Sequence, residues 1–240
     1  MSDPHPSERY SFIKDKNPRE IVLLRGSGCR WRRCRFCNYH LDFSHDQAAN
    51  DRLNFDVLSR VAGITGVLEV ISNSGSFSDL SENTLAEIVR VCEEKNIQRL
   101  HVECHWQDRA QIAPFRARLA AHGIVLRVKG GVETFDGDFR ERVFDKGIPP
   151  ETTPAELAEY FDECCLLFGV NSESLAQMER DVEVGLAHFQ RICINIMVDN
   201  GTAVKRSDDV VKLFMRSIYP AVKDDPRVDV LLNNTDFGVG

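Results

Sequence analysis

Short apolar runs that alternate with helical stretches are the feature that most constrains the fold of this chain. Between the runs, apolar residues recur at helical spacing, as Leu85, Ile88, Val89 and Cys92 do. The apolar runs cover residues 20–24, 67–71, 100–104, 124–128, 165–168, 192–198 and 228–232. Strands that alternate with helices form βαβ units, which build a parallel sheet with right-handed crossovers. The pattern predicts an α/β fold, and both an open curved sheet and an incomplete barrel fit it.

The helical stretches and the connecting segments predict a single domain. The predicted helices begin near Ser81, pass through 112–119, end at Gly147, cover 175–189 and pass through 210–218. The proline-rich stretch 149–154 is expected to be a long loop rather than a domain boundary. Residues 1–18 form a polar N-terminal arm, and 19–240 form one domain that includes a C-terminal strand segment.

Length and charge exclude several classes of protein. The chain has 240 residues, enough for one sizeable core, and its formal net charge of -7 argues against nucleic-acid binding through the whole surface. No apolar run approaches the roughly 20 residues that a transmembrane helix needs. The start, MSDPHPSERY, lacks the basic end and apolar stretch of a signal peptide, so we expect a cytoplasmic protein.

Three of the eight cysteines lie close together directly after the first apolar run. Four residues separate Cys29 from Cys34, and two separate Cys34 from Cys37. In a reducing compartment such a group indicates metal binding rather than disulfides. Three thiolates can hold three irons of a four-iron four-sulfur cluster and leave the fourth iron open. A zinc site completed by His40 or His45 is the alternative.

The other five cysteines, Cys92, Cys104, Cys164, Cys165 and Cys193, are scattered through apolar segments. Free cysteine behaves as a small hydrophobic residue in protein cores. We therefore predict that these five are core residues without a function.

The cysteine loop at the end of a strand, with Phe36 just before the last cysteine, resembles the radical S-adenosylmethionine (SAM) superfamily over essentially the whole chain. The resemblance implies an incomplete parallel βα barrel of about six βα units. It also implies a 4Fe-4S cluster held by Cys29, Cys34 and Cys37. In that family the open iron binds SAM, which is cleaved reductively to a 5′-deoxyadenosyl radical that abstracts hydrogen from a substrate.

The spacing between Cys29 and Cys34 is one residue longer than the usual family spacing. Among compact members of the superfamily, the queuine lyases have a similar size and a similarly lengthened spacing. This resemblance implies carbon–nitrogen bond cleavage in a deazaguanine base. Two alternatives stay open: an enzyme that activates a glycyl radical on a partner protein, and a non-enzymatic zinc or iron–sulfur binding module.

Several short segments match the places where the family contacts SAM. The glycine-containing stretch after the second run corresponds to the family motif that meets the amino group of the cofactor. The stretch after the fourth run corresponds to the segment that reaches its ribose and carboxylate. By this resemblance the cofactor-binding residues are Phe36, Asn73, Ser74, Gly75, Ser76, Lys129 and Glu133.

Polar residues at the ends of other runs are candidates for substrate binding. The candidates are Glu103, His105, Trp106, Asp199, Asn233 and Asp236, with Asn195, Asn200 and Asn234 beside them. In a parallel sheet the carboxyl ends of the strands gather at one edge, where ligands bind. Carboxylates and amides with an aromatic ring suit a small, flat, hydrogen-bonding ligand such as a nucleobase.

Four arginines, Arg30, Arg32, Arg33 and Arg35, lie among the three cysteines. They fit compensation of the negative charge of the cluster, pairing with carboxylates, or contact with an acidic electron donor. A nucleic-acid contact is a further interpretation. The resemblance implies a flavodoxin-like or ferredoxin-like electron donor.

Overall fold

The computed structural model describes residues 8–38, 41–72 and 75–239. Within these ranges the chain forms one eight-stranded sheet in which the strands follow their sequence order. The strands are β1 (Tyr10–Ile13), β2 (Arg19–Leu24), β3 (Val67–Ser72), β4 (Arg99–Cys104), β5 (Val125–Glu133), β6 (Glu163–Phe168), β7 (Arg191–Ile196) and β8 (Val228–Leu231). β1 pairs with β2 antiparallel, and all the other neighbours are parallel.

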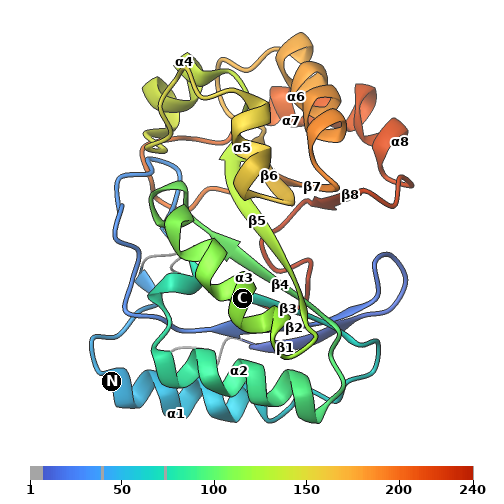
Figure 1. Cartoon of the computed structure of the whole chain (residues 1–240). Coiled ribbons are helices and arrows are strands. Elements are labelled where there is room, and N and C mark those ends of the chain that lie inside the picture. The colour runs from blue at the N-terminus through green and yellow to red at the C-terminus, as the bar shows by residue number, and fades with distance from the viewer. Residues whose placement is uncertain (1–7, 39–40, 73–74, 240) are drawn as a thin grey trace.

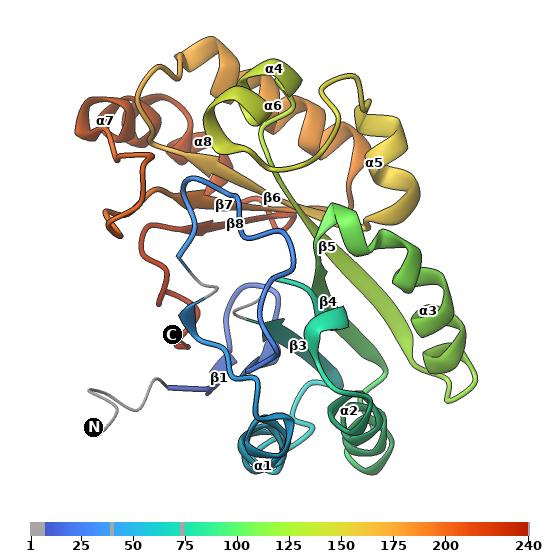
Figure 2. The same ribbon diagram turned by 90° about the vertical axis from the view of Figure 1, so that its left-hand side faces the viewer.

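Helices cover the outer face of the curved sheet, as Figures 1 and 2 show. They are α1 (Gln47–Leu58), α2 (Glu82–Glu94), α3 (Ile112–Ala120), α4 (Gly137–Phe139), α5 (Pro154–Tyr160), α6 (Leu175–His188), α7 (Asp208–Ser217) and α8 (Tyr219–Val222). Short helical turns are η2 (Phe77–Asp79), η3 (Trp106–Gln111) and the π-helix η4 (Arg140–Phe144). This curled, mostly parallel sheet confirms the predicted α/β class and the incomplete barrel. Within the described ranges, no helix has both the length and the apolar character needed to cross a bilayer.

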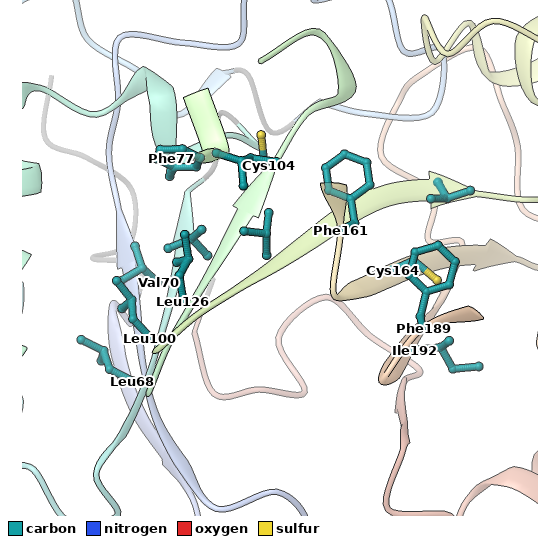
Figure 3. Packing of buried hydrophobic residues seen from close by; sticks show 14 of the residues in the cluster. Leu68, Val70, Phe77, Leu100, Cys104, Leu126, Phe161, Cys164, Phe189 and Ile192 are labelled. Atoms are coloured by element: carbon teal, nitrogen blue, oxygen red, sulfur yellow. The ribbon is translucent and has the colours of Figure 1, made fainter. Parts of the chain in front are cut away.

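The main core lies between the sheet and its helices. Alternate strand residues such as Leu68, Val70, Leu100 and Leu126 belong to one buried apolar cluster (Figure 3). Helix residues such as Ile88 complete this cluster. Because successive strand residues point to opposite faces, the residues between them face the inside of the curve.

Two helices, α1 and α5, were not predicted from the sequence. α1 lacks the apolar spacing that predicts a helix, because three of its buried residues are polar: Asn50, Asp51 and Asn54. α5 begins at Pro154, the last residue of the predicted loop 149–154, and Thr153 and Glu156 form a reciprocal capping box around this proline start. The apolar pattern does not reveal α1, because polar tertiary contacts replace hydrophobic burial there, and it does not reveal α5, whose sequence signal is the capping box.

Other boundaries also differ from the sequence prediction. β5 runs to Glu133, so Lys129 and Glu133 lie in the strand itself rather than after it. The second half of the predicted arm forms β1, which is part of the sheet. The loop after β1 also reaches β8, because the Asn17 amide donates to the carboxylate of Asp229 at 3.3 Å.

Candidate active site

The interior of the barrel is closed at the amino ends of the strands by a layer of buried charged residues, which we call the charged floor. Its members are Arg19, Glu69, His101, Glu163, Arg191 and Asp229, one from each of six strands. Arg19 on β2 lies 3.2 Å from Asp229 on β8, so the two edges of the parallel sheet meet across the interior. Arg191 pairs with Glu163 at 2.8 Å and with Asp229 at 3.4 Å.

The electrostatics of the charged floor keep its carboxylates ionised. Burial would raise the pKa of Glu163, but His101 at 2.9 Å and Arg191 hold this pKa at about 2. Burial likewise opposes ionisation of Glu69, yet Lys129, Arg19 and Arg191 hold its pKa well below the ordinary value. Sequence reasoning missed this layer, whose only signal is a charged residue near the start of each strand.

Above the charged floor lies a cavity of about 240 Å³ at the carboxyl ends of the strands. The sheet contributes Glu103, Lys129, Cys165, Cys193 and Asn195 to its lining, and the C-terminal segment contributes Leu231, Asn234, Phe237 and Val239. Val239 also packs on Ile21 and Leu23 of β2, so this segment lies against the inner face of the sheet. The cavity is therefore walled by the sheet below and by the end of the chain at its side.

Cys29, Cys34 and Cys37 all line this cavity and are half-buried. Their loop leaves β2 through Gly28, whose φ of +104° lies in a region that favours glycine. The amide of Cys37 donates to the carbonyl of Cys34 at 3.3 Å, which closes a tight turn between these two cysteines. Burial raises the pKa of Cys34 to about 12, and the nearby cation of Lys146 opposes this rise.

The polar face of α1 fixes the base of the cysteine loop. The amide of Asn54 donates to the carbonyl of Arg25 at 3.0 Å and accepts from its N–H at 2.9 Å. Asn50 donates to the carbonyl of Gly26 at 3.1 Å. On the other side, the amide of Arg35 donates to the carbonyl of Phe144 at 2.9 Å. The loop is thus held by protein contacts at both its start and its middle.

The three thiols fit a cluster better than a single ion. Among the described residues, no three His, Cys, Asp or Glu side chains converge on the position of one metal ion. An iron–sulfur cluster needs no such convergence, because each thiolate binds a different iron. Of the two histidines considered as a fourth zinc ligand, His45 packs edge-on against Phe43, and His40 lies outside the described residues.

The predicted cofactor-binding residues divide into three groups. Phe36, Gly75, Lys129 and Glu133 line the cavity. Ser76 is buried beside it, with its hydroxyl 2.9 Å from that of Ser78. Asn73 and Ser74 lie outside the described residues.

Glu133 and Lys146 form a buried ion pair at the cavity, with 2.7 Å between Oε1 and Nζ. Glu133 has a φ of +69° and follows a bulge in β5, a strained conformation for a residue that carries a side chain. The Lys146 ammonium also lies 5.5 Å from the centre of the Phe36 ring. Sequence reasoning missed Lys146, because it follows a π-helix and carries no motif.

The predicted substrate-binding residues fall into two groups, those that line the cavity and those that do not. Glu103 and His105 line the cavity, but Trp106 is buried against Tyr160 and Phe161, outside the lining. Asp199, Asn233 and Asp236 are exposed and do not belong to the lining. Asp236 instead accepts the backbone N–H of Leu232 at 2.7 Å, which shapes the C-terminal turn. Asn195, Asn200 and Asn234, noted beside them, do line the cavity.

Burial is the largest cause of the pKa shifts of Glu103 and His105, the two predicted substrate residues that line the cavity. It raises the pKa of Glu103 to about 7, against the opposing cation of Lys129. It lowers the pKa of His105 to about 3, helped by Lys146. At neutral pH the histidine is therefore neutral, and Glu103 takes up a proton far more readily than an ordinary glutamate.

The prediction that all five scattered cysteines are core residues is wrong in part. Cys92 and Cys164 are buried in the main core, as expected, and Cys104 lies in that core at the edge of the cavity. Cys165 and Cys193 instead line the cavity from neighbouring positions on β6 and β7. Alternation along each strand puts them on the inner face, which a short apolar run cannot reveal.

Comparison with known proteins places this site in a family. No protein-family model matches the sequence, and no curated protein matches it. A solved structure, a queuine lyase from Clostridium spiroforme bound to SAM and queuine, is 37% identical with a TM-score of 0.92. The match covers 98% of this chain and 100% of that one. Together with the three-cysteine loop at the mouth of an incomplete barrel, this likeness shows that the chain belongs to the queuine lyase family of radical SAM enzymes.

Proposed function

We propose that this enzyme is a queuine lyase, which cleaves a carbon–nitrogen bond of a deazaguanine base by radical chemistry. The observation that carries the proposal is one cavity lined both by the three clustered cysteines and by the half-buried side chain of Glu103. The solved relative supports it, since that protein was found with both SAM and queuine. A cavity walled by the C-terminal segment suits a small molecule rather than a glycyl-radical partner protein.

In this proposal Cys29, Cys34 and Cys37 hold a 4Fe-4S cluster, whose open iron takes SAM. When bound, the cluster and SAM supply a 5′-deoxyadenosyl radical. The protein positions the cofactor: Phe36 offers a ring face to the adenine, and the backbone at Gly75 permits close approach. Asn73, Ser74 and Ser76 complete the stretch that receives its amino group.

The ion pair of Glu133 and Lys146 lies beside the cysteines and supplies both signs of charge for the polar groups of SAM. Lys129 lines the cavity, and its ammonium is fixed by the Glu69 carboxylate of the charged floor. Both contacts are preorganised, which reduces the entropy lost on binding.

Glu103 is the residue that we propose recognises the base. A guanine-like edge presents a ring N–H and an exocyclic amino group side by side, and a carboxylate accepts both. The amides of Asn195 and Asn234 supply further donors and acceptors on the cavity wall. His105, Trp106, Asp199, Asn233 and Asp236 remain predicted substrate residues, of which His105 borders the cavity.

The proposal includes a partner and a location. Reduction of the cluster needs a one-electron donor, for which we propose a flavodoxin-like or ferredoxin-like protein. We also propose that the enzyme works in the cytoplasm, where reducing conditions keep its cysteines from forming disulfides.

The test uses enzyme that is purified and reconstituted without oxygen and then reduced. Queuine should increase the formation of 5′-deoxyadenosine, and mass spectrometry should detect a smaller deazaguanine product. Replacing Cys34 by Ala should abolish the brown colour and both products. Cys92→Ala, which changes a core cysteine on α2, is the matched control and should retain them. A colourless wild-type protein with bound zinc, or no response to queuine, would contradict the proposal.

A further inference from the structure

The loop that carries the three cysteines is also strongly basic on its outer side. The side chains of Arg30 and Arg33 are 67% and 62% exposed. Arg35 and Arg142, the latter from η4, are exposed as well. Cys34 lies between Arg33 and Arg35 in the sequence, so these side chains flank a residue that lines the cavity.

Hydrogen bonds hold the two basic segments together. Besides its backbone bond to Phe144, Arg35 donates from Nη1 to the carbonyl of Arg142 at 3.2 Å. The indole of Trp31 donates to the carbonyl of Asp145 at 2.7 Å, and Arg33 pairs with the carboxylate of Asp145 at 3.2 Å. We call the surface formed by Arg33, Arg35 and Arg142 the arginine surface, and its members occupy fixed segments.

Most of the charge of the arginine surface is not neutralised by ion pairs within the described residues. Among the described residues, no carboxylate lies within ion-pair distance of Arg35 or Arg142, and Asp145 alone pairs with Arg33. The buried cation next to the cysteines is Lys146, so exposed arginines are not required to compensate the thiolates. Arg30 does not belong to the surface, because its side chain pairs with Asp108 of η3 and not with the 142–145 segment.

The rest of the chain has the opposite charge. With a formal net charge of -7, the molecule as a whole repels acidic proteins, so a basic region is where such a protein is attracted. Such complementarity steers encounter and fixes orientation more than it adds affinity. Electron transfer rates fall steeply with distance, so a partner bound to Arg33 and Arg35 approaches the cluster at its Cys34 ligand.

We propose that the arginine surface is the docking site of a small acidic electron-carrier protein that gives one electron to the cluster. This inference rests on the proposed function, because it needs the cluster at Cys29, Cys34 and Cys37. The carrier is oxidised by one electron, the cluster is reduced by one electron, and no further reactant is required.

The test compares two reductants on the reconstituted enzyme without queuine. The double variant Arg35→Glu/Arg142→Glu should be reduced by purified flavodoxin roughly 10- to 100-fold more slowly than wild type at low salt. Reduction by dithionite, which needs no protein docking, should change by less than about twofold. The readout is loss of the visible absorbance of the cluster. Added salt should slow the wild type with flavodoxin far more than it slows the variant.

The matched control is Arg180→Glu/Arg216→Glu, the same charge change at exposed positions of α6 and α7. It should behave as wild type with both reductants, and Arg35→Gln/Arg142→Gln should be intermediate with flavodoxin. Equal slowing with both reductants, or no slowing with flavodoxin, would overturn the proposal. A nucleic-acid contact is the other interpretation of these arginines, so RNA binding by the wild type that the double variant loses would also overturn it. Because no outcome depends on queuine, a wrong substrate assignment leaves the result readable.

Discussion

The two ends of the barrel interior differ in whether their charged side chains form ion pairs. At the amino ends of the strands, every member of the charged floor pairs with another, as Arg19 does with Asp229. At the carboxyl ends, Glu103 lines the cavity, and no cation lies within ion-pair distance of it among the described residues. Paired charges close the barrel, whereas a charge left available at the other end is free to bind a ligand.

The largest expected effect comes from breaking the charged floor. Arg191→Met should leave Glu163 and Asp229 buried with fewer partners and lower the free energy of unfolding by about 3–5 kcal/mol. Urea denaturation of the apoprotein measures this change. A loss below about 1 kcal/mol would show that the floor charges are not coupled in the folded state.

The ion pair of Glu133 and Lys146 lies between the two extremes, since it is buried like the floor but borders the cavity. Lys146→Met should lower the free energy of unfolding by about 3 kcal/mol, because it leaves the Glu133 carboxylate buried and unpaired. The double variant Lys146→Met/Glu133→Gln should recover most of this stability. It should nevertheless bind SAM more weakly than the wild type does. Full SAM affinity in the double variant, measured by calorimetry on the reconstituted protein, would assign the pair to stability alone.

On the cavity side, Glu103→Gln should reduce kcat/KM for queuine by about 10- to 100-fold, as expected for a lost charged hydrogen bond. Formation of 5′-deoxyadenosine without queuine should continue, because the variant leaves the cysteine loop intact. Steady-state kinetics with both products quantified separate the two. Unchanged kcat/KM would remove Glu103 from the substrate site.

The same variant should remove a pH dependence of stability that Glu103 gives to the cavity end. The folded-state pKa of Glu103, about 7, lies above its ordinary value of 4.5. The folded protein therefore binds this proton more tightly, and stability is lost as pH rises from about 4.5 to about 7. Relative to Glu103→Gln, the wild type should lose about 1–2 kcal/mol over this window, since the half-buried side chain keeps some solvent contact. Parallel denaturation curves at pH 5 and about pH 8 test this difference.

The smallest effects are expected for two adjacent cysteines that face opposite sides of β6. Cys164→Ala should lower the free energy of unfolding by about 1 kcal/mol through lost packing in the core. Cys165→Ala should hardly change stability but should raise KM for queuine a few-fold, because its side chain borders the cavity. Identical behaviour of the two variants would mean that the cavity does not hold the substrate at β6.

The parts of the molecule that could be predicted from sequence are those with local signals. The apolar runs predicted the parallel strands, and the spacing of Cys29, Cys34 and Cys37 predicted a metal-binding loop. The charged floor could not be predicted, because Arg19 and Asp229 are brought together only by the curvature of the whole sheet. Lys146 was missed for a different reason, since it follows a π-helix, carries no motif, and meets its partner Glu133 only through the fold of the connecting segment.

The asparagines of α1 have a consequence for how the enzyme acquires its cluster. Asn50 and Asn54 hold Arg25 and Gly26 by hydrogen bonds that involve no metal, so the first ligand residue emerges from a fixed point. Part of the chain entropy that three thiolates lose on closing around a cluster is therefore already lost when the apoprotein folds. Cluster assembly should then be a fast loading reaction on a shaped loop, rather than a refolding of that loop around iron.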